Sequence, residues 1–184
     1  MTYRNVVAAV VRALASDVLS SAGGCSVEPR IQCAPVPGVL SSRDVRLLDD
    51  GWVRGRMKSH LTAEQRQALV AKYAADFAVK VMAAERMAVR VVSPAPARFV
   101  ACACVTWAAP KLPGESGKRS NSVLPDGWYC MDRWSEEPVP VKTQERWRRQ
   151  IRRDLEREVD AALVALQEVL EADGLLAAES ACIA

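Results

Sequence analysis

The sequence predicts an all-α protein of about five helices, with a helix-turn-helix-like arrangement and a long C-terminal helix. Half of the 184 residues are hydrophobic, which is enough for a packed core. In three long stretches, apolar residues recur at the spacing of helices that bury one face. Turn-forming residues separate these stretches, and no internal repeat is visible. We therefore expect residues 1–184 to form a single helical domain.

Residues 3–20 form the first predicted helix, because apolar side chains recur there at helical spacing until Gly23 and Gly24 stop it. Residues 21–40 hold three prolines and three glycines, which indicates a long loop. A short helical turn is expected next, around Asp44–Leu48.

A long helix from Thr62 to Val92 is expected to be the spine of the core. Thr62 and Gln65 have the spacing of a capping box, and Ser93-Pro94 is expected to end the helix. Its apolar residues share about one third of the circumference. They are Val70, Tyr73, Phe77, Val81, Ala84, Ala88 and Val91.

Residues 94–108 predict a short buried helix. The run Phe99–Trp107 is rich in residues that favour β-structure, so a strand remains an alternative. Residues 109–126 follow as a second long loop. Asp126 could then cap a short helix that reaches Trp134. With a turn after it, this would make the last helix the third element of the helix-turn-helix-like unit.

The last helix is predicted over residues 143–173, about 45 Å long at 1.5 Å per residue, with Gly174 placed to terminate it. Five bases share one of its faces, opposite an apolar stripe, and arginine binds phosphate through a planar fork. The five are Lys142, Arg146, Arg149, Arg153 and Arg157. This face predicts contacts with nucleic-acid phosphates, while a protein-binding face and an ordinary solvated face remain alternatives.

Three bases in the second loop could add flexible phosphate contacts, or the loop could simply be solvated. They are Lys111, Lys118 and Arg119. The charge distribution also favours an anionic partner. Residues 154–184 carry one base and eight acids, a net charge of −7, and since the whole chain carries +3, residues 1–153 carry +10. The acidic end could equally be one solvated helix face.

The apolar end of the last helix is a candidate protein-binding surface, through Leu163, Leu166 and Leu170. A second copy of the chain could be that partner, which leaves a homodimer open. Residues 1–25 predict an amphipathic helix rather than a signal peptide, since Arg12 and Asp17 interrupt the apolar run. No uncharged run approaches the roughly 20 residues that span a bilayer. We expect no membrane contact and a cytoplasmic location.

Metal, cofactor and catalytic sites are not expected. Cys102, Cys104, Cys130 and His60 are the one set of candidate zinc ligands, but two cysteines two positions apart on a helix point in different directions. Cys102 and Cys104 are therefore predicted to be core residues. The chain shows no glycine-rich phosphate loop, nucleophile elbow or paired-acid motif. We therefore expect that the protein is not an enzyme.

The chain loosely resembles a family of phage proteins. Residues 142–149 read Lys-Thr-Gln-Glu-Arg-Trp-Arg-Arg and open a helix that ends in Leu170–Leu176, and Leu61–Val70 adds to the likeness. Over about residues 60–175 it is similar to the late-gene transcription antiterminators of lambdoid-type phages. The resemblance implies binding to a DNA site near a promoter, with Arg146, Arg149 and Arg153 at the DNA, followed by loading onto RNA polymerase.

Two hypotheses follow from these observations. The leading one is a phage-type transcription regulator that binds double-stranded DNA and a protein partner such as RNA polymerase. The rival is a non-enzymatic interaction module, such as a phage inhibitor of a host protein or an assembly adaptor.

Overall fold

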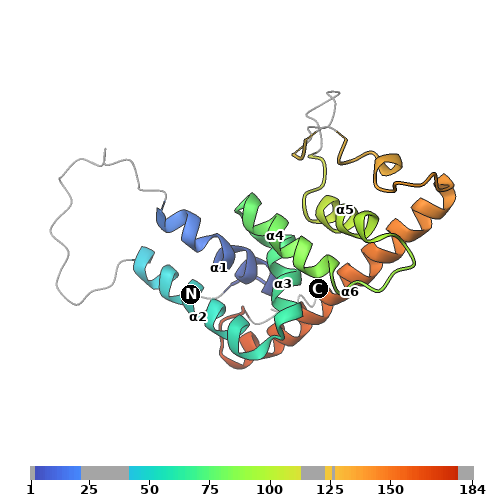
Figure 1. Cartoon of the computed structure of the whole chain (residues 1–184). Coiled ribbons are helices and arrows are strands. Elements are labelled where there is room, and N and C mark those ends of the chain that lie inside the picture. Colours follow the sequence, from blue (N-terminus) through green and yellow to red (C-terminus); the bar gives the residue numbers. More distant parts are fainter. Residues whose placement is uncertain (1–2, 22–41, 113–122, 126, 178–184) are drawn as a thin grey trace, which may run out of the picture. The chain divides into compact units, whose positions relative to one another are not determined.

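The computed structural model describes residues 3–21, 42–112, 123–125 and 127–177 (Figure 1), and these residues contain helices but no strands. The helices are α1 (Val6–Ser21), α2 (Ser42–His60), α3 (Ala63–Tyr73), α4 (Phe77–Ala88), α5 (Ala97–Ala108), the 3-10 helix η1 (Met131–Arg133) and α6 (Val141–Ala172). The predicted all-α fold and long C-terminal helix are thereby confirmed.

The chain divides into two compact units. Unit 1 comprises residues 1–61 and 163–184, and unit 2 comprises residues 62–162. Helix α6 contributes its first part to unit 2 and its end to unit 1. The expectation of a single domain stays a prediction. The predicted loop over residues 21–40 falls almost entirely outside the described residues, as do residues 113–122 of the second loop.

Unit 1 joins the start of the chain to the end of α6. The N–H of Tyr3 donates to the carbonyl of Leu175 at 2.7 Å, and the N–H of Ala177 donates to the carbonyl of Tyr3 at 2.8 Å. The guanidinium of Arg56, on α2, donates two hydrogen bonds to Asp173, at 2.6 and 2.9 Å. These contacts fix the segment that follows α6 against α2 and the first residues of the chain.

Helix α6 ends where the sequence predicts. Gly174 has φ +68°, a left-handed conformation that glycine adopts without strain. The N–H of Gly174 donates to Glu171 at 3.0 Å and the N–H of Leu175 to Leu170 at 2.9 Å. These two bonds form a Schellman motif, which satisfies carbonyls that the helix would otherwise leave unpaired.

Helix α2 corrects the prediction of a short turn around Asp44–Leu48, because it has 19 residues. Gly51 and Gly55 lower the helix propensity of this segment, since each costs about 1 kcal/mol relative to alanine. Their exposed positions face away from the buried side, which holds Asp50, Val53 and Met57 at spacings of three and four. Packing of this side against α1 outweighs the low helix propensity.

The predicted helix over residues 62–92 is wrong as a continuous helix. Its capping box is confirmed, since Gln65 N–H donates to Thr62 Oγ1 and Thr62 N–H donates to Gln65 Oε1. Ala74, however, leaves the helical region with ψ 141°. Asp76 then caps a second helix by accepting the N–H of Val79 at 3.0 Å. An aspartate inside an apolar pattern was the signal for this break.

Unit 2 has an aromatic and aliphatic core. Helix α4 packs against both α3 and α5. Phe99 on α5 contacts Trp134 edge-to-face at 5.1 Å between ring centres, and Trp147 on α6 at 5.5 Å. The apolar side of α6 lies in the same unit with Ile151 and Leu155 each 1% exposed. The predicted apolar stripe of the last helix is thus buried.

The segment between α5 and α6 differs from the prediction. The helix predicted over 94–108 is present as α5, although it begins at Ala97. The short helix expected up to Trp134 is only the 3-10 turn η1. Successive turns form instead, as Cys130 N–H donates to Gly127 and Arg133 N–H to Cys130, each at 3.1 Å. The helix-turn-helix-like unit that was expected to end in α6 therefore lacks its middle helix.

Candidate nucleic-acid interface

The exposed side of α6 presents four of the five predicted phosphate-binding bases. Because the apolar side of α6 is buried, the opposite side faces solvent. Lys142, Arg146, Arg149 and Arg153 are all exposed and line one open hollow on the helix surface together with Thr143 and Glu145. We call these four bases the α6 basic face.

The charges of the α6 basic face are only weakly compensated. Arg149 lies 3.6 Å from Glu145 one turn earlier, and both side chains are largely exposed. Such exposed pairs contribute little. Arg153 donates to the neutral Gln150 at 2.8 Å. Lys142 and Arg146 have no ion-pair or hydrogen-bond partner among the described residues. Three net positive charges therefore remain available to an anionic ligand.

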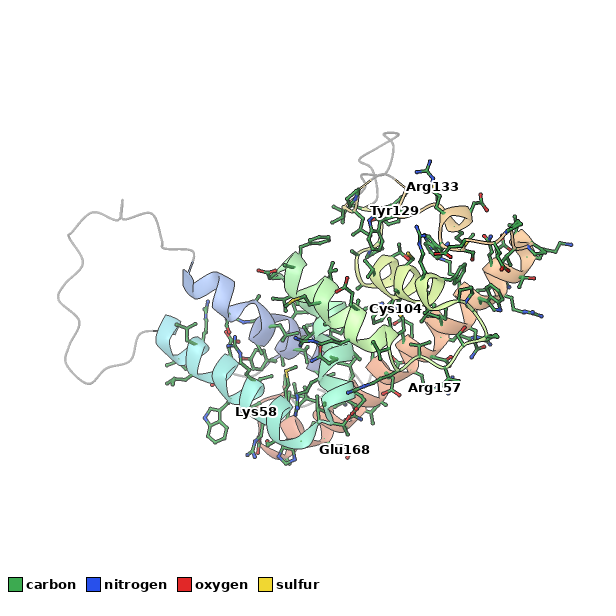
Figure 2. The ribbon with its side chains drawn as sticks, in the orientation of Figure 1. Lys58, Cys104, Tyr129, Arg133, Arg157 and Glu168 are labelled. Atoms are coloured by element: carbon green, nitrogen blue, oxygen red, sulfur yellow. The ribbon has the colours of Figure 1, made fainter. Side chains whose placement is uncertain are left out.

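The fifth predicted base, Arg157, is also exposed but does not line this hollow. It donates to Asp154 at 2.5 Å and lines a different hollow, with Arg86 and Arg90 of the segment that ends α4. Figure 2 labels Arg157 on α6. Arg157 lies one turn after Arg153, where the acidic part of α6 begins. Asp154 therefore compensates the charge of Arg157.

The loop bases are not shown to extend the α6 basic face. Lys111 is exposed, and its Nζ lies 5.1 Å from the ring centre of Tyr129. Lys118 and Arg119 lie outside the described residues. Lys111 lines a separate cavity with three bases that sequence reasoning did not assign to phosphate binding. These are Lys72, Arg148 and Arg152.

The predicted partner-binding leucines require a correction. Leu166 and Leu170 have no exposed surface, and Leu163 is half-buried. Leu166 and Leu170 continue the buried side of α6 that begins with Ile151, at spacings of three and four residues. Because Leu166 and Leu170 are fully covered, the three leucines do not form an exposed docking surface together.

Of the two α5 cysteines predicted to be core residues, Cys104 is buried and Cys102 is half-buried. Cys104 is buried, and burial raises the pKa of its thiol to about 12. Burial also raises the pKa of Cys102, while the charge of Arg98 lowers it slightly. Cys130 is exposed. Within the ranges that the structure describes, no three His, Cys, Asp or Glu side chains are grouped so that they could hold a metal ion.

Thiol alkylation should distinguish these positions. With iodoacetamide at neutral pH, we expect Cys130 to be modified in the native protein and Cys104 to stay protected until the protein unfolds, because the thiolate is the reactive form. Peptide mapping by mass spectrometry measures both. Equal modification of Cys104 and Cys130 before unfolding would contradict the buried environment of α5, and a urea-unfolded sample provides the control for complete reaction.

Comparisons with protein-family models, curated proteins and solved structures found no match. Among the described helices, none is both long and apolar enough to cross a membrane.

Proposed function

We propose that this protein is a non-catalytic regulator that binds duplex DNA through the α6 basic face. The observation that carries the proposal is the exposure of Lys142, Arg146, Arg149 and Arg153 along one side of a helix whose other side is buried. Core packing accounts for the buried side and leaves these four side chains free to contact a ligand.

The dimensions of the face suit a DNA groove. Lys142 and Arg153 are eleven residues apart, which corresponds to about 16 Å along the helix axis. Duplex DNA carries about one negative charge per 1.7 Å of its axis, and its major groove, about 12 Å wide, admits an α-helix. A face of this length therefore reaches several phosphates, and arginine forks can bind them in a bidentate manner.

The resemblance of residues 60–175 to phage late-gene antiterminators supports a role in transcription, with RNA polymerase as the protein partner. The burial of Leu166 and Leu170 weakens the rival proposal of an interaction module, because that proposal drew on an apolar end of α6 that is covered. DNA binding is therefore the function to test first.

Fluorescence anisotropy with a mixed-sequence duplex provides that test. Release of counterions from about four phosphates should weaken binding about a hundredfold between roughly 50 and 200 mM salt. Reversing Arg146, Arg149 and Arg153 to glutamate should abolish binding. The matched control reverses three exposed arginines of unit 2 elsewhere, at Arg86, Arg98 and Arg133, and so changes the net charge equally.

The control variant should keep most of the affinity and the salt dependence. If both triple variants lose binding equally, net charge rather than the α6 basic face is responsible, and the proposed interface is wrong. If the unmodified protein does not bind duplex DNA at low salt, the proposed function is wrong.

A further inference from the structure

Unit 2 contains a cavity of about 380 Å³ whose lining is basic and aromatic. Four bases line it, from three different parts of unit 2: Lys72, Lys111, Arg148 and Arg152. Trp107 and Tyr129 contribute aromatic rings. Figure 2 shows Tyr129 on the segment between α5 and α6. The volume lies within the range of roughly 300–1,000 Å³ that is typical of small-molecule sites.

A single carboxylate compensates part of the charge. Glu156 accepts from Lys72 Nζ at 2.7 Å and from Trp107 Nε1 at 2.9 Å, and lies 3.9 Å from Arg152. Burial alone would raise the pKa of Glu156, but these hydrogen bonds and the charges of Lys72 and Arg152 lower it overall. Glu156 is thus an anion at neutral pH, and it compensates the charges of two of the four bases, Lys72 and Arg152.

The other two bases of the cavity are Lys111 and Arg148. Neither has an acidic partner among the residues that the structure describes. Arg148 places its guanidinium carbon 6.0 Å from the ring centre of Trp134, and its Nη1 lies 4.0 Å from the sulfur of Met131. Both bases therefore border the cavity over aromatic rings, which leaves their N–H groups available to an anion.

The ring of Tyr129 is held in place at the cavity. Its hydroxyl donates to the carbonyl of Ala109 at 2.9 Å and accepts the N–H of Leu124 at 3.3 Å. Tyr129 is half-buried, so part of the residue remains exposed. A fixed, partly exposed aromatic ring is a surface on which a planar base can stack, and such stacking contributes about 1–3 kcal/mol.

We propose that this cavity binds a nucleotide. Its phosphate would be held by Lys111, Arg148 and Arg152, and its base would lie against Tyr129. An anion without a ring would contact only the basic side chains. The cavity presents basic side chains and aromatic rings together, which suits a ligand with both a phosphate and a planar ring. A free nucleotide and a nucleotide within single-stranded nucleic acid share this chemistry.

The proposal does not rest on duplex binding by the α6 basic face. Arg148 and Arg149 are consecutive, exposed residues of one helix, but Arg148 lines the cavity and Arg149 belongs to the α6 basic face. They therefore form a matched pair, because Arg148→Glu and Arg149→Glu change the same charge in the same helix. No duplex is present in the experiment, so the two proposals can fail separately.

Isothermal titration calorimetry with the full chain tests the proposal. The probes are the nucleoside monophosphates, inorganic phosphate, and a short single-stranded oligonucleotide. We expect at least one nucleoside monophosphate to bind about tenfold more tightly than inorganic phosphate, because of stacking. Arg148→Glu should weaken nucleotide binding at least about tenfold, as expected for loss of a charge-assisted hydrogen bond, and Arg149→Glu should leave it within about twofold.

A second variant, Lys111→Glu, should weaken nucleotide binding as Arg148→Glu does, although Lys111 lies outside α6. Thermal unfolding verifies that each variant is folded. Tighter binding of the oligonucleotide than of any monophosphate would identify single strands as the source of the ligand if Arg148→Glu removes this preference and Arg149→Glu keeps it. The reverse order of affinities would identify free nucleotides. The proposal is overturned if no nucleotide or oligonucleotide binds at millimolar concentration, if phosphate binds as tightly as nucleotides, or if Arg149→Glu weakens binding as much as Arg148→Glu.

Discussion

Replacing Trp134 with alanine should lower the free energy of unfolding by about 3–5 kcal/mol. Trp134 is 2% exposed, and its ring lies edge-to-face against Phe99 at 5.1 Å. Its Nε1 also donates to the carbonyl of Trp128 at 2.7 Å, which fixes the turns that lead into α6. Because domains are stable by only about 5–15 kcal/mol, this loss would remove a large part of the stability of unit 2.

Urea unfolding monitored by circular dichroism measures this effect, and Trp52→Ala is the matched control. Trp52 is 58% exposed, so the same substitution there should cost less than about 1 kcal/mol. Its main described contact is with Arg56, whose guanidinium carbon lies 5.3 Å from the ring centre. Equal losses at Trp134 and Trp52 would contradict the aromatic core of unit 2.

Replacing Asp50 with alanine should destabilise unit 1 by about 2–4 kcal/mol. Asp50 is 1% exposed and accepts hydrogen bonds from the hydroxyl of Tyr3 at 2.6 Å and from Arg12 at 3.2 and 3.3 Å. Burial raises the pKa of Tyr3, and the hydrogen bond to Asp50 raises it further. Without the carboxylate, the buried hydroxyl loses its acceptor, whereas Arg12 can still reach water.

A double-mutant cycle checks the assignment. Tyr3→Phe removes one hydrogen bond and should cost about 1 kcal/mol. If the Tyr3–Asp50 bond is responsible, the double variant should cost less than the sum of the two single variants, because both remove the same interaction. Strict additivity, or a loss below 1 kcal/mol for Asp50→Ala, would contradict the buried network. Urea denaturation measures all three variants.

Local signals predicted the parts of this protein that depend on neighbouring residues. Thr62 and Gln65 form their capping box, and Gly174 ends α6, because each acts within one turn of the helix. The two faces of α6 follow equally from spacing, so the buried Leu155 and the exposed Arg149 both lie where the sequence places them. The α6 basic face was therefore available from the sequence.

Other features required the packed structure. Trp52 is exposed although it is a large aromatic residue, whereas Leu166 was expected at a partner surface and is buried. Hydrophobicity favours burial for both, but the neighbours that cover a side chain come from other elements. The same reason explains why Asp50, a charged residue, is a buried hydrogen-bond acceptor in the long helix α2.

The cavity is the clearest case of a feature that only the tertiary structure decides. Lys72 comes from α3, Lys111 from the segment after α5, and Arg148 from α6. No spacing in the sequence relates these three bases, because their proximity depends on how α3, α5 and α6 pack in unit 2. The sequence by itself determined the helices with strong local signals and the charged face of the last one. Packing decided how far α2 extends, which aromatic rings are buried, and which bases share a cavity, because burial and proximity depend on residues far apart in the chain.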